Sequence, residues 1–330
     1  MDVISAGIVI ADCVARPVRR PPEPGQLELV DEIGLYLGGS AVNTGSALTR
    51  LGVDVALVGR VGRDGFGDFL AAGARALGLD TRFLARTEAA TSATLVHVEP
   101  GGERSFLHAV GANAHLRAAD MPLEALAAEG ARALHVAGFY VLPGLEPEVP
   151  DLFARASGLG LLTSLDTVWD ATDHWERIHA ALDVTDVFCP GLGEAQRITG
   201  CMEPFDALDG LLALGVRRAA AVKMGPDGVL LGSPDGVRLH VKAASVNAVD
   251  GTGAGDAFIG GFLASLLRGE SLADAGRLGC AAGALCVSAM GATSGLGDLP
   301  TTRALADTLS VHTLPSSSPT SRTRIPGVQP

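Results

Sequence analysis

The chain has 330 residues and a formal net charge of −12, and 47% of its residues are apolar. This length and apolar content suffice for one large α/β domain, or for such a domain with a small appendage. The acidic balance argues against nucleic acid or an anionic membrane as the main partner, because both bind a basic face.

Strand-like and helix-like segments alternate from the N-terminus onward. Apolar, β-branched runs predict strands, and Ala- and Leu-rich runs with a helical period predict helices. The predicted strands are residues 3–9, 53–58, 133–136, 160–165, 186–189 and 219–222, and the predicted helices include 66–77 and 149–156. Such alternation predicts a mostly parallel sheet covered by helices on both faces.

Two segments interrupt this alternation. Residues 14–37 combine Pro-rich turns with the run LELVDEIGLYL, and residues 92–108 alternate apolar and polar residues around a Pro-Gly-Gly turn. The second pattern is typical of a β-hairpin. We expect the two segments to pair into a small separate sheet, which suggests a lid that closes over a ligand.

The remaining features predict a cytoplasmic domain with a tail. The five cysteines lack zinc-ligand spacing, so we expect reduced thiols. The start, MDVISAGIVI, has no basic leader region, and the longest small-apolar run, residues 279–292, is too short to span a bilayer. Residues 310–330 are rich in Ser, Thr, Pro and Arg, so we expect a disordered tail after a folded domain of residues 1–309.

The most informative segment is Asp250-Gly-Thr-Gly-Ala-Gly-Asp256, which leads into the helical pattern AFIGGFLASLLRG. A glycine loop at a helix N-terminus offers backbone N–H groups and the positive dipole end to a phosphate. Asp256, in the first helical turn, suits a base that takes a proton from a hydroxyl as it attacks phosphorus. It also suits an ordinary helix cap. The chain has no GxxxxGK(S/T) loop, and GTGAGD lacks the last Gly of GxGxxG, which disfavours an NAD-binding oxidoreductase.

Two motifs resemble those of the ribokinase-like (PfkB) carbohydrate kinase family. The first is Gly38-Gly39-Ser40-Ala41-Val42-Asn43, and the second, about 210 residues later, is the 250–256 loop. The resemblance covers roughly residues 1–300. It implies a three-layer α/β/α sandwich with a mostly parallel central sheet and a small β-sheet lid. It also implies a kinase that uses ATP and Mg²⁺ to phosphorylate an alcohol group of a small sugar or sugar acid.

The resemblance assigns roles to individual residues. Asp256 would be the general base. The amides that would form the anion hole are those of Gly253, Ala254 and Gly255. The residues that would bind the acceptor are Asp12, Gly38, Gly39 and Asn43. Carboxylates and amides suit sugar hydroxyls, and glycine permits close approach. Apart from the resemblance, Asp12 suits a turn at the end of the first strand, and Asn43 suits a helix N-cap.

On the nucleotide side, Lys223, Gly225 and Gly228 resemble the family's ATP-binding loop, although Pro-Asp-Gly is also a turn signal by itself. Glu194 matches the Glu of an N-x-x-E motif that holds Mg²⁺ through water, and a solvated helical Glu is the alternative. Gly191 stands where the family has Asn and offers no side-chain ligand. This departure leaves open a sugar-binding sensor that has lost catalysis.

Two further implications concern a cation and assembly. Many members of the family bind a monovalent cation, which implies K⁺ at Asp250 and the carbonyl of Thr252, with a second ligand loop near residues 288–295. Some members dimerise through the lid, which makes a homodimer of this chain an open expectation.

The acceptor itself is weakly constrained. Arg104, in the 92–108 hairpin, suits a substrate carboxylate or phosphate, or is a solvated hairpin residue. Asp166 ends a predicted strand, where it binds the substrate or caps a turn. Tyr140 stands where ribokinases have a carboxylate, which weakens the case for ribose. Ribose, fructose, 2-keto-3-deoxygluconate and a nucleoside such as adenosine all stay open.

Overall fold

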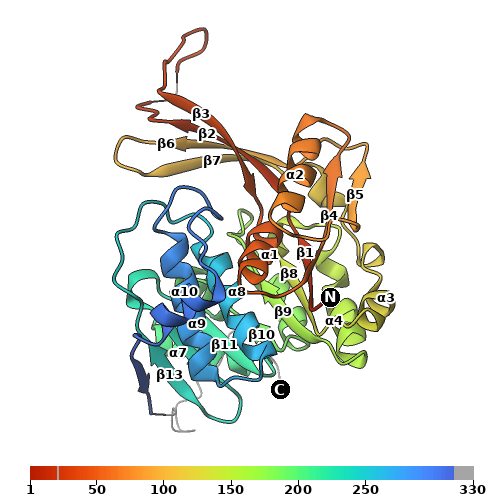
Figure 1. Cartoon of the computed structure of the whole chain (residues 1–330), viewed down its shortest axis with the longest axis vertical. Helices are drawn as coiled ribbons and strands as arrows, with labels where there is room; N and C mark the ends of the chain where they lie inside the picture. The colour runs from red at the N-terminus through yellow and green to blue at the C-terminus, as the bar shows by residue number, and fades with distance from the viewer. Residues whose placement is uncertain (21, 316–330) are drawn as a thin grey trace.

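A large sheet between two layers of helices and a smaller sheet at one end make up the computed structural model, which describes residues 1–20 and 22–315 (Figure 1). The strands are β1 Val3–Gly7, β2 Ile10–Arg16, β3 Glu32–Gly38, β4 Val55–Gly62, β5 Leu84–Thr87, β6 Ala93–Val98, β7 Arg104–Ala109, β8 Ala133–Ala137, β9 Leu162–Asp166, β10 Val187–Phe188, β11 Ala219–Lys223, β12 Val229–Gly232, β13 Arg238–Val241 and β14 Val311–Thr313. The α-helices are α1 Ser40–Arg50, α2 Gly65–Ala76, α3 Leu123–Ala128, α4 Val149–Gly158, α5 His179–Leu182, α6 Leu192–Thr199, α7 Pro204–Ala213, α8 Ala254–Leu267, α9 Leu272–Cys286 and α10 Leu299–Ala306.

The main sheet has the strand order β14-β13-β12-β11-β10-β9-β8-β1-β4-β5. Neighbours from β11 to β5 pair in parallel, and β12, β13 and β14 add an antiparallel edge. Every residue of β1, β8 and β9 is buried, as expected for parallel strands covered on both faces. The predicted mostly parallel sheet is therefore confirmed.

Alternate residues of the central strands enter two separate hydrophobic clusters. Ile4 and Leu134 face a cluster built with α3, α4, α6 and α7. Val3 and Ala133 face a second cluster built with α1, α2, α8 and α9. Because successive strand residues point to opposite faces, the apolar runs hold helices on both sides of the sheet.

Helix α8 packs closely between α1 and α9. A Cβ atom on Gly260 would lie 2.6 Å from the Cβ atom of Ala47 in α1, and a Cβ atom on Gly261 would lie 2.6 Å from the carbonyl oxygen of Leu278 in α9. The two glycines therefore permit a helix contact that larger residues would prevent. This contact brings the N-terminal halves of α1 and α8 together.

Four strands form the lid, in the order β3-β2-β6-β7 (Figure 1). β2 pairs antiparallel with β3 and parallel with β6, and β6 and β7 form the predicted hairpin. The expected pairing of segments 14–37 and 92–108 is confirmed. However, β2 begins at Ile10, because the chain turns at Gly7, where φ is 144° and a Cβ atom would lie 2.1 Å from the carbonyl oxygen of Ala137. Asp12 thus lies inside a lid strand rather than at the end of the first strand.

The last strand lies beyond the predicted domain boundary. β14 pairs with β13 through Val241↔Val311 and Leu239↔Thr313, so the folded domain continues past residue 309. Residues 316–330, where most of the predicted tail lies, are outside the described residues. In the described part of the chain, no helix has the length and apolarity needed to cross a membrane.

Candidate active site

The glycine loop leads directly into the N-terminus of α8, as predicted. Gly253 adopts φ 76°, and a Cβ atom there would lie 2.6 Å from the Cβ atom of Ala292. Glycine is therefore required at residue 253 both by backbone conformation and by space. The first turn of a helix carries backbone N–H groups that lack intrahelical acceptors, so the start of α8 is suited to bind an anion.

Asp256 lies in this first turn and is held from α1. Nδ2 of Asn43 donates to Oδ2 of Asp256 at 2.8 Å, and Oγ1 of Thr44 donates to the Asp256 carbonyl at 3.4 Å. Burial raises the pKa of Asp256, while hydrogen bonds from Asn43 and Ser40 and the charge of Lys223 act against that rise. A carboxylate with a raised pKa is a stronger proton acceptor than an exposed one.

Asn43 presents a second polar atom to the site. Gly39 precedes α1 as its N-cap, so Asn43 lies within the helix and is not the cap. Its Oδ1 atom is buried and has no hydrogen-bond partner among the described residues. Buried polar atoms are nearly always partnered, so a ligand hydroxyl at this position would complete the side chain's hydrogen bonding.

Asp12 lies against the double-glycine segment. A Cβ atom on Gly38 would lie 2.0 Å from Oδ2 of Asp12, so only glycine leaves room for the carboxylate. Gly39 adopts φ 94°, which also favours glycine. Burial raises the pKa of Asp12 to about 6, although a hydrogen bond from Thr94 partly opposes the rise.

Lys223 ends β11 beside the anion site. A Cβ atom on Gly255 would lie 2.9 Å from Nζ of Lys223, and Nζ lies 3.7 Å from Oδ1 of Asp166. Burial acts to lower the pKa of Lys223, but nearby carboxylates, Asp166 foremost, outweigh it and raise the pKa. Asp166 is itself buried at the end of β9. It therefore lies beside Lys223 at the carboxyl ends of the central strands.

Glu194 caps a helix rather than pointing freely to solvent. Its Oε2 atom accepts from the backbone N–H of Gly191 at 2.7 Å, and Oε1 accepts from Oγ1 of Thr167 at 3.0 Å. Among the described residues, no group of three or more His, Cys, Asp and Glu side chains is placed to hold a metal ion directly. Mg²⁺ in kinases is bound largely by phosphates and water, so Glu194 and Asp166 fit Mg²⁺ only through water.

The predicted ATP-binding turn follows Lys223. Gly225–Asp227 form one 3-10 turn, with φ 58° at Gly225 and φ 92° at Gly228. A Cβ atom on Gly228 would lie 2.0 Å from the carbonyl oxygen of Val241, which accounts for that glycine by packing. The turn therefore follows Lys223 at the C-terminal end of β11.

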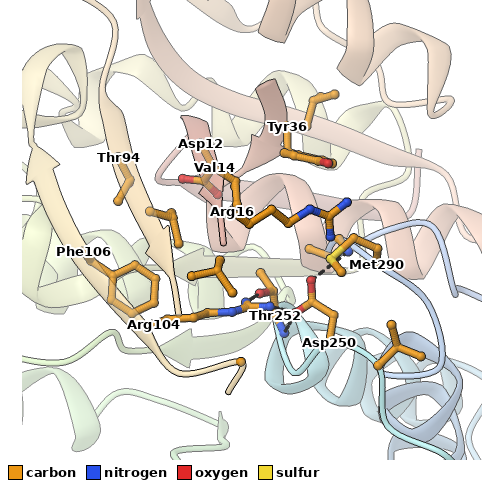
Figure 2. Close-up of a pocket in the computed structure, with 17 residues that line it drawn as sticks. Asp12, Val14, Arg16, Tyr36, Thr94, Arg104, Phe106, Asp250, Thr252 and Met290 are labelled. Carbon is orange, nitrogen blue, oxygen red and sulfur yellow. Dashed lines mark hydrogen bonds and ion pairs between the residues drawn. The ribbon is translucent and has the colours of Figure 1, made fainter. Parts of the chain in front are cut away.

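The lid reaches the glycine loop through Arg104 (Figure 2). Its guanidinium forms an ion pair of 2.5 Å with Oδ1 of Asp250 and a hydrogen bond with Oγ1 of Thr252. Oδ2 of Asp250 accepts from the backbone N–H of Gly291 at 2.9 Å. Burial would raise the pKa of Asp250, but the amides of Gly291 and Thr252 and the arginine lower it. Asp250 thus joins the lid, the glycine loop and the predicted 288–295 loop.

A cavity of about 290 Å³ lies between the inner face of the lid and these two loops. Four predicted residues line it: Asp12, Arg104, Asp250 and Thr252. Further lining residues were not predicted, namely Val14, Arg16, Tyr36, Thr94, Val96, Phe106 and Met290. Their signal in the sequence is the two-residue alternation of the lid strands, which groups residues 12, 14 and 16 with 94, 96 and 98. Tyr140 belongs to the core, where its hydroxyl donates to the carbonyl of Trp175 at 2.7 Å.

Comparisons with known proteins agree with this geometry. A model of the family described as "pfkB family carbohydrate kinase" matches residues 1–299. Aminoimidazole riboside kinase of Salmonella typhimurium is 31% identical over 295 residues, which cover 78% of this chain and 84% of that protein. 2-Dehydro-3-deoxygluconokinase of Bacillus subtilis is 29% identical, with 88% and 91% covered. A crystal structure of a putative ribokinase II from E. coli, in complex with ATP and Mg²⁺, superposes with a TM-score of 0.80 at 26% identity, covering 93% of this chain and 99% of that one.

Proposed function

This chain belongs to the pfkB family of carbohydrate kinases, and we propose that it transfers the γ-phosphate of ATP to a hydroxyl of a small sugar-bearing acceptor, with Asp256 as general base. The observation that carries the proposal is the hydrogen bond from Asn43 to Asp256 at the start of α8. It fixes the carboxylate directly after the amides of Gly253, Ala254 and Gly255, so the base and the anion hole share one helical turn.

In this mechanism the acceptor oxygen attacks the γ-phosphorus while its proton passes to Asp256. The bond from that phosphorus to the β,γ-bridging oxygen breaks, and ADP leaves. The three amides stabilise the charge on the transferring group. Asp12 and Oδ1 of Asn43 accept hydrogen bonds from other acceptor hydroxyls and so orient the ring, and Gly38 and Gly39 admit it closely.

For the nucleotide side, we propose that Lys223 faces the phosphates and that the turn at Gly225 and Gly228 lies beside the nucleotide. Lys223 is supported by its position, since a Cβ atom added to Gly255 would lie 2.9 Å from Nζ of Lys223. Glu194 and Asp166 would hold water molecules of Mg²⁺, which neutralises phosphate charge when bound. Asp166 was predicted to bind the acceptor, but its neighbour Lys223 supports this second role better.

Arg104 occupies the position at Asp250 and Thr252 where a monovalent cation was predicted to bind. Both carboxylate oxygens of Asp250 accept protein hydrogen bonds, and the guanidinium supplies a positive charge 2.5 Å away. The carbonyl oxygens of Thr252 and Ala292 both lie near the thiol of Cys286, at 3.5 and 3.2 Å from Sγ. We therefore propose that Arg104 neutralises Asp250 in place of K⁺, and that it does not bind a carboxylate or phosphate of the acceptor.

We also propose that two copies of the chain associate through the outer face of the lid. Odd-numbered positions of β3, β6 and β7 place large apolar side chains on this face, and Ile33, Leu35, Leu95 and Leu107 are all exposed. Soluble monomers seldom expose contiguous apolar patches of this kind. Covering them with the same face of a second copy would remove them from water.

The test of the kinase proposal is ADP formation from ATP with Mg²⁺ against a panel of sugars, sugar acids and nucleosides. We expect turnover with one class of acceptor and a loss of about 10²–10⁴-fold in kcat in Asp256→Asn. Asp151→Asn is the matched control, because Asp151 is an exposed acid in the first turn of α4. Near wild-type turnover in Asp256→Asn would refute the base. Acceptor binding without any turnover would favour a sensor.

A further inference from the structure

The inner face of the lid carries three cross-strand rows of distinct chemistry. The first row, Asp12, Thr94 and His108, is polar, and the second, Val14, Val96 and Phe106, is apolar. The third row consists of Arg16, Val98 and Arg104. Val98 pairs with Arg104, and Arg16 joins this row because it follows Ala15, which pairs with His97. The polarity of the cavity wall therefore changes in steps with distance from Asp12.

The first row adjoins the hydroxyl-binding residues. Asp12 contacts Gly38, which leads through Gly39 into α1 and Asn43. A sugar whose hydroxyls bind Asp12 would therefore lie at this row, with Asn43 beyond the residues that line the cavity. The second row lies two residues farther along each strand, which is about 7 Å. A ring bonded directly to the sugar reaches the second row, and a bare sugar leaves it empty.

The second row suits a flat apolar group. Val14 and Val96 line the cavity from the lid, and Met290 and Val249 line it from the body. Phe106 projects into the cavity, is 62% exposed, and stacks on no other aromatic ring among the described residues. An exposed phenyl face at a cavity wall can stack on a planar ring.

The third row does not favour an anionic substituent. Both arginines already have carboxylate partners, Glu32 at 2.6 Å from Arg16 and Asp250 at 2.5 Å from Arg104. A carboxylate or phosphate on the acceptor would have to compete with Asp250, whose side chain is only 4% exposed. The guanidinium groups still offer N–H donors to the polar edge of an uncharged ring.

We propose that this cavity is a subsite for an uncharged planar substituent, so that the preferred acceptor is a nucleoside-like glycoside rather than a free sugar or a sugar acid. The proposal rests on the proposed kinase function. It assigns the sugar to the Asp12–Asn43 end, the planar ring to Val14, Val96 and Phe106, and the polar edge of that ring to the arginine end.

The test compares kcat/KM for adenosine, inosine and uridine with that for D-ribose, D-fructose and 2-keto-3-deoxygluconate, in wild type, Phe106→Ala and Leu159→Ala. Leu159 is the control, because it is also an exposed apolar residue, at 41%, but lies after α4 in the body, outside both faces of the lid. We expect a nucleoside to be the best acceptor. Phe106→Ala should lower its kcat/KM about tenfold more than that of any sugar, and Leu159→Ala should leave all ratios unchanged.

Where turnover is seen, two outcomes would overturn the subsite. One is a free sugar or sugar acid as the best acceptor, which leaves the kinase function intact. The other is a Phe106→Ala variant that affects the nucleosides no more than Leu159→Ala does. If no compound is phosphorylated, calorimetric titration with the same nucleosides separates the two proposals. Binding that Phe106→Ala weakens supports the subsite although the kinase proposal fails, and absence of nucleoside binding overturns the subsite as well.

Discussion

The missing side chain at Gly38 determines the surroundings of Asp12. A Cβ atom on residue 38 would overlap Oδ2 of Asp12. The Asp12 carboxylate can therefore pack against the backbone of residue 38 because that residue is glycine. The same close fit removes water from the carboxylate and raises its pKa to about 6. The ionised Asp12 carboxylate, which suits the binding of hydroxyls, therefore lowers the free energy of unfolding at neutral pH.

This cost predicts a pH-dependent gain in stability for Asp12→Asn. The folded-state pKa, about 6, lies above the ordinary value of 3.8, so the folded protein binds this proton more tightly than the unfolded chain. The free energy of unfolding contributed by Asp12 therefore falls as the pH rises from about 4 to about 6, and the loss is complete above that range. We expect Asp12→Asn to be about 1–3 kcal/mol more stable than wild type at pH 7 and little different at pH 4.

Urea unfolding at both pH values measures this difference, with Asp151→Asn as the exposed control. A gain that is the same at pH 4 and pH 7 would show that charge burial is not its cause. Because Asp12 is also proposed to bind hydroxyls, the stabilised variant should have a higher KM for the acceptor.

The sequence alone predicted the positions of candidate residues whose neighbours in the site are also close to them in sequence. Asp256 and its glycine loop are adjacent in sequence, so the motif alone placed the carboxylate at a helix N-terminus. The partner of Arg104 was not found, because Asp250 lies 146 residues away and an arginine in a hairpin has no local sign of its contact. Likewise, the contact of Asp166 with Lys223 was not predicted, because it depends on how β9 and β11 are spaced in the sheet.

Among the elements, the lid is attached to the body in two different ways. All four strands are joined to the body through the chain itself, and the β6–β7 hairpin also reaches the glycine loop through the side chain of Arg104 (Figures 1 and 2). The hairpin can therefore separate from the loop by breaking one ion pair and one hydrogen bond.

We expect Arg104→Gln to loosen this hairpin. Removal of the guanidinium leaves Asp250 buried without its positive partner, which favours an open lid. Backbone hydrogen exchange in residues 93–109 should accelerate, and KM for the acceptor should rise about tenfold, which corresponds to about 1.4 kcal/mol. Hydrogen-exchange mass spectrometry and steady-state kinetics measure the two effects.

Arg16→Gln is the matched control for exchange, because Arg16 pairs with Glu32 inside the lid and, among the described residues, acts on Asp250 only through its charge and not through an ion pair. Equal acceleration in both variants would mean that the Arg104–Asp250 pair does not hold the lid closed.

The elements themselves were largely predictable. The buried β-branched runs have the length and composition of parallel strands, so the sheet and its helices followed from periodicity. Periodicity did not give the start of β2, since the turn at Gly7 depends on the carbonyl of Ala137 in a neighbouring strand. Nor did it give β14, whose three residues form a strand only because β13 offers an edge to pair with.

For the molecule as a whole, the outer face of the lid predicts a concentration-dependent dimer. A charge on this face would have to be desolvated in the dimer, so we expect Leu95→Asp to be monomeric where wild type is dimeric. Sedimentation velocity over a range of concentrations measures the difference. Leu159→Asp is the control, because Leu159 is also exposed, at 41%, but lies after α4 in the body. A wild-type chain that is monomeric at every concentration would contradict the dimer.

The alternation of the lid strands gives these proposals an evolutionary consequence. Even-numbered positions of β2, β6 and β7 face the acceptor cavity, and odd-numbered positions face the surface proposed for assembly. Point substitutions can therefore alter which compound is phosphorylated while quaternary structure is conserved, or the reverse, because the two traits occupy separate positions on one ribbon. A one-residue insertion that shifted the register of β7 would exchange the two faces of that strand and change both traits in a single step.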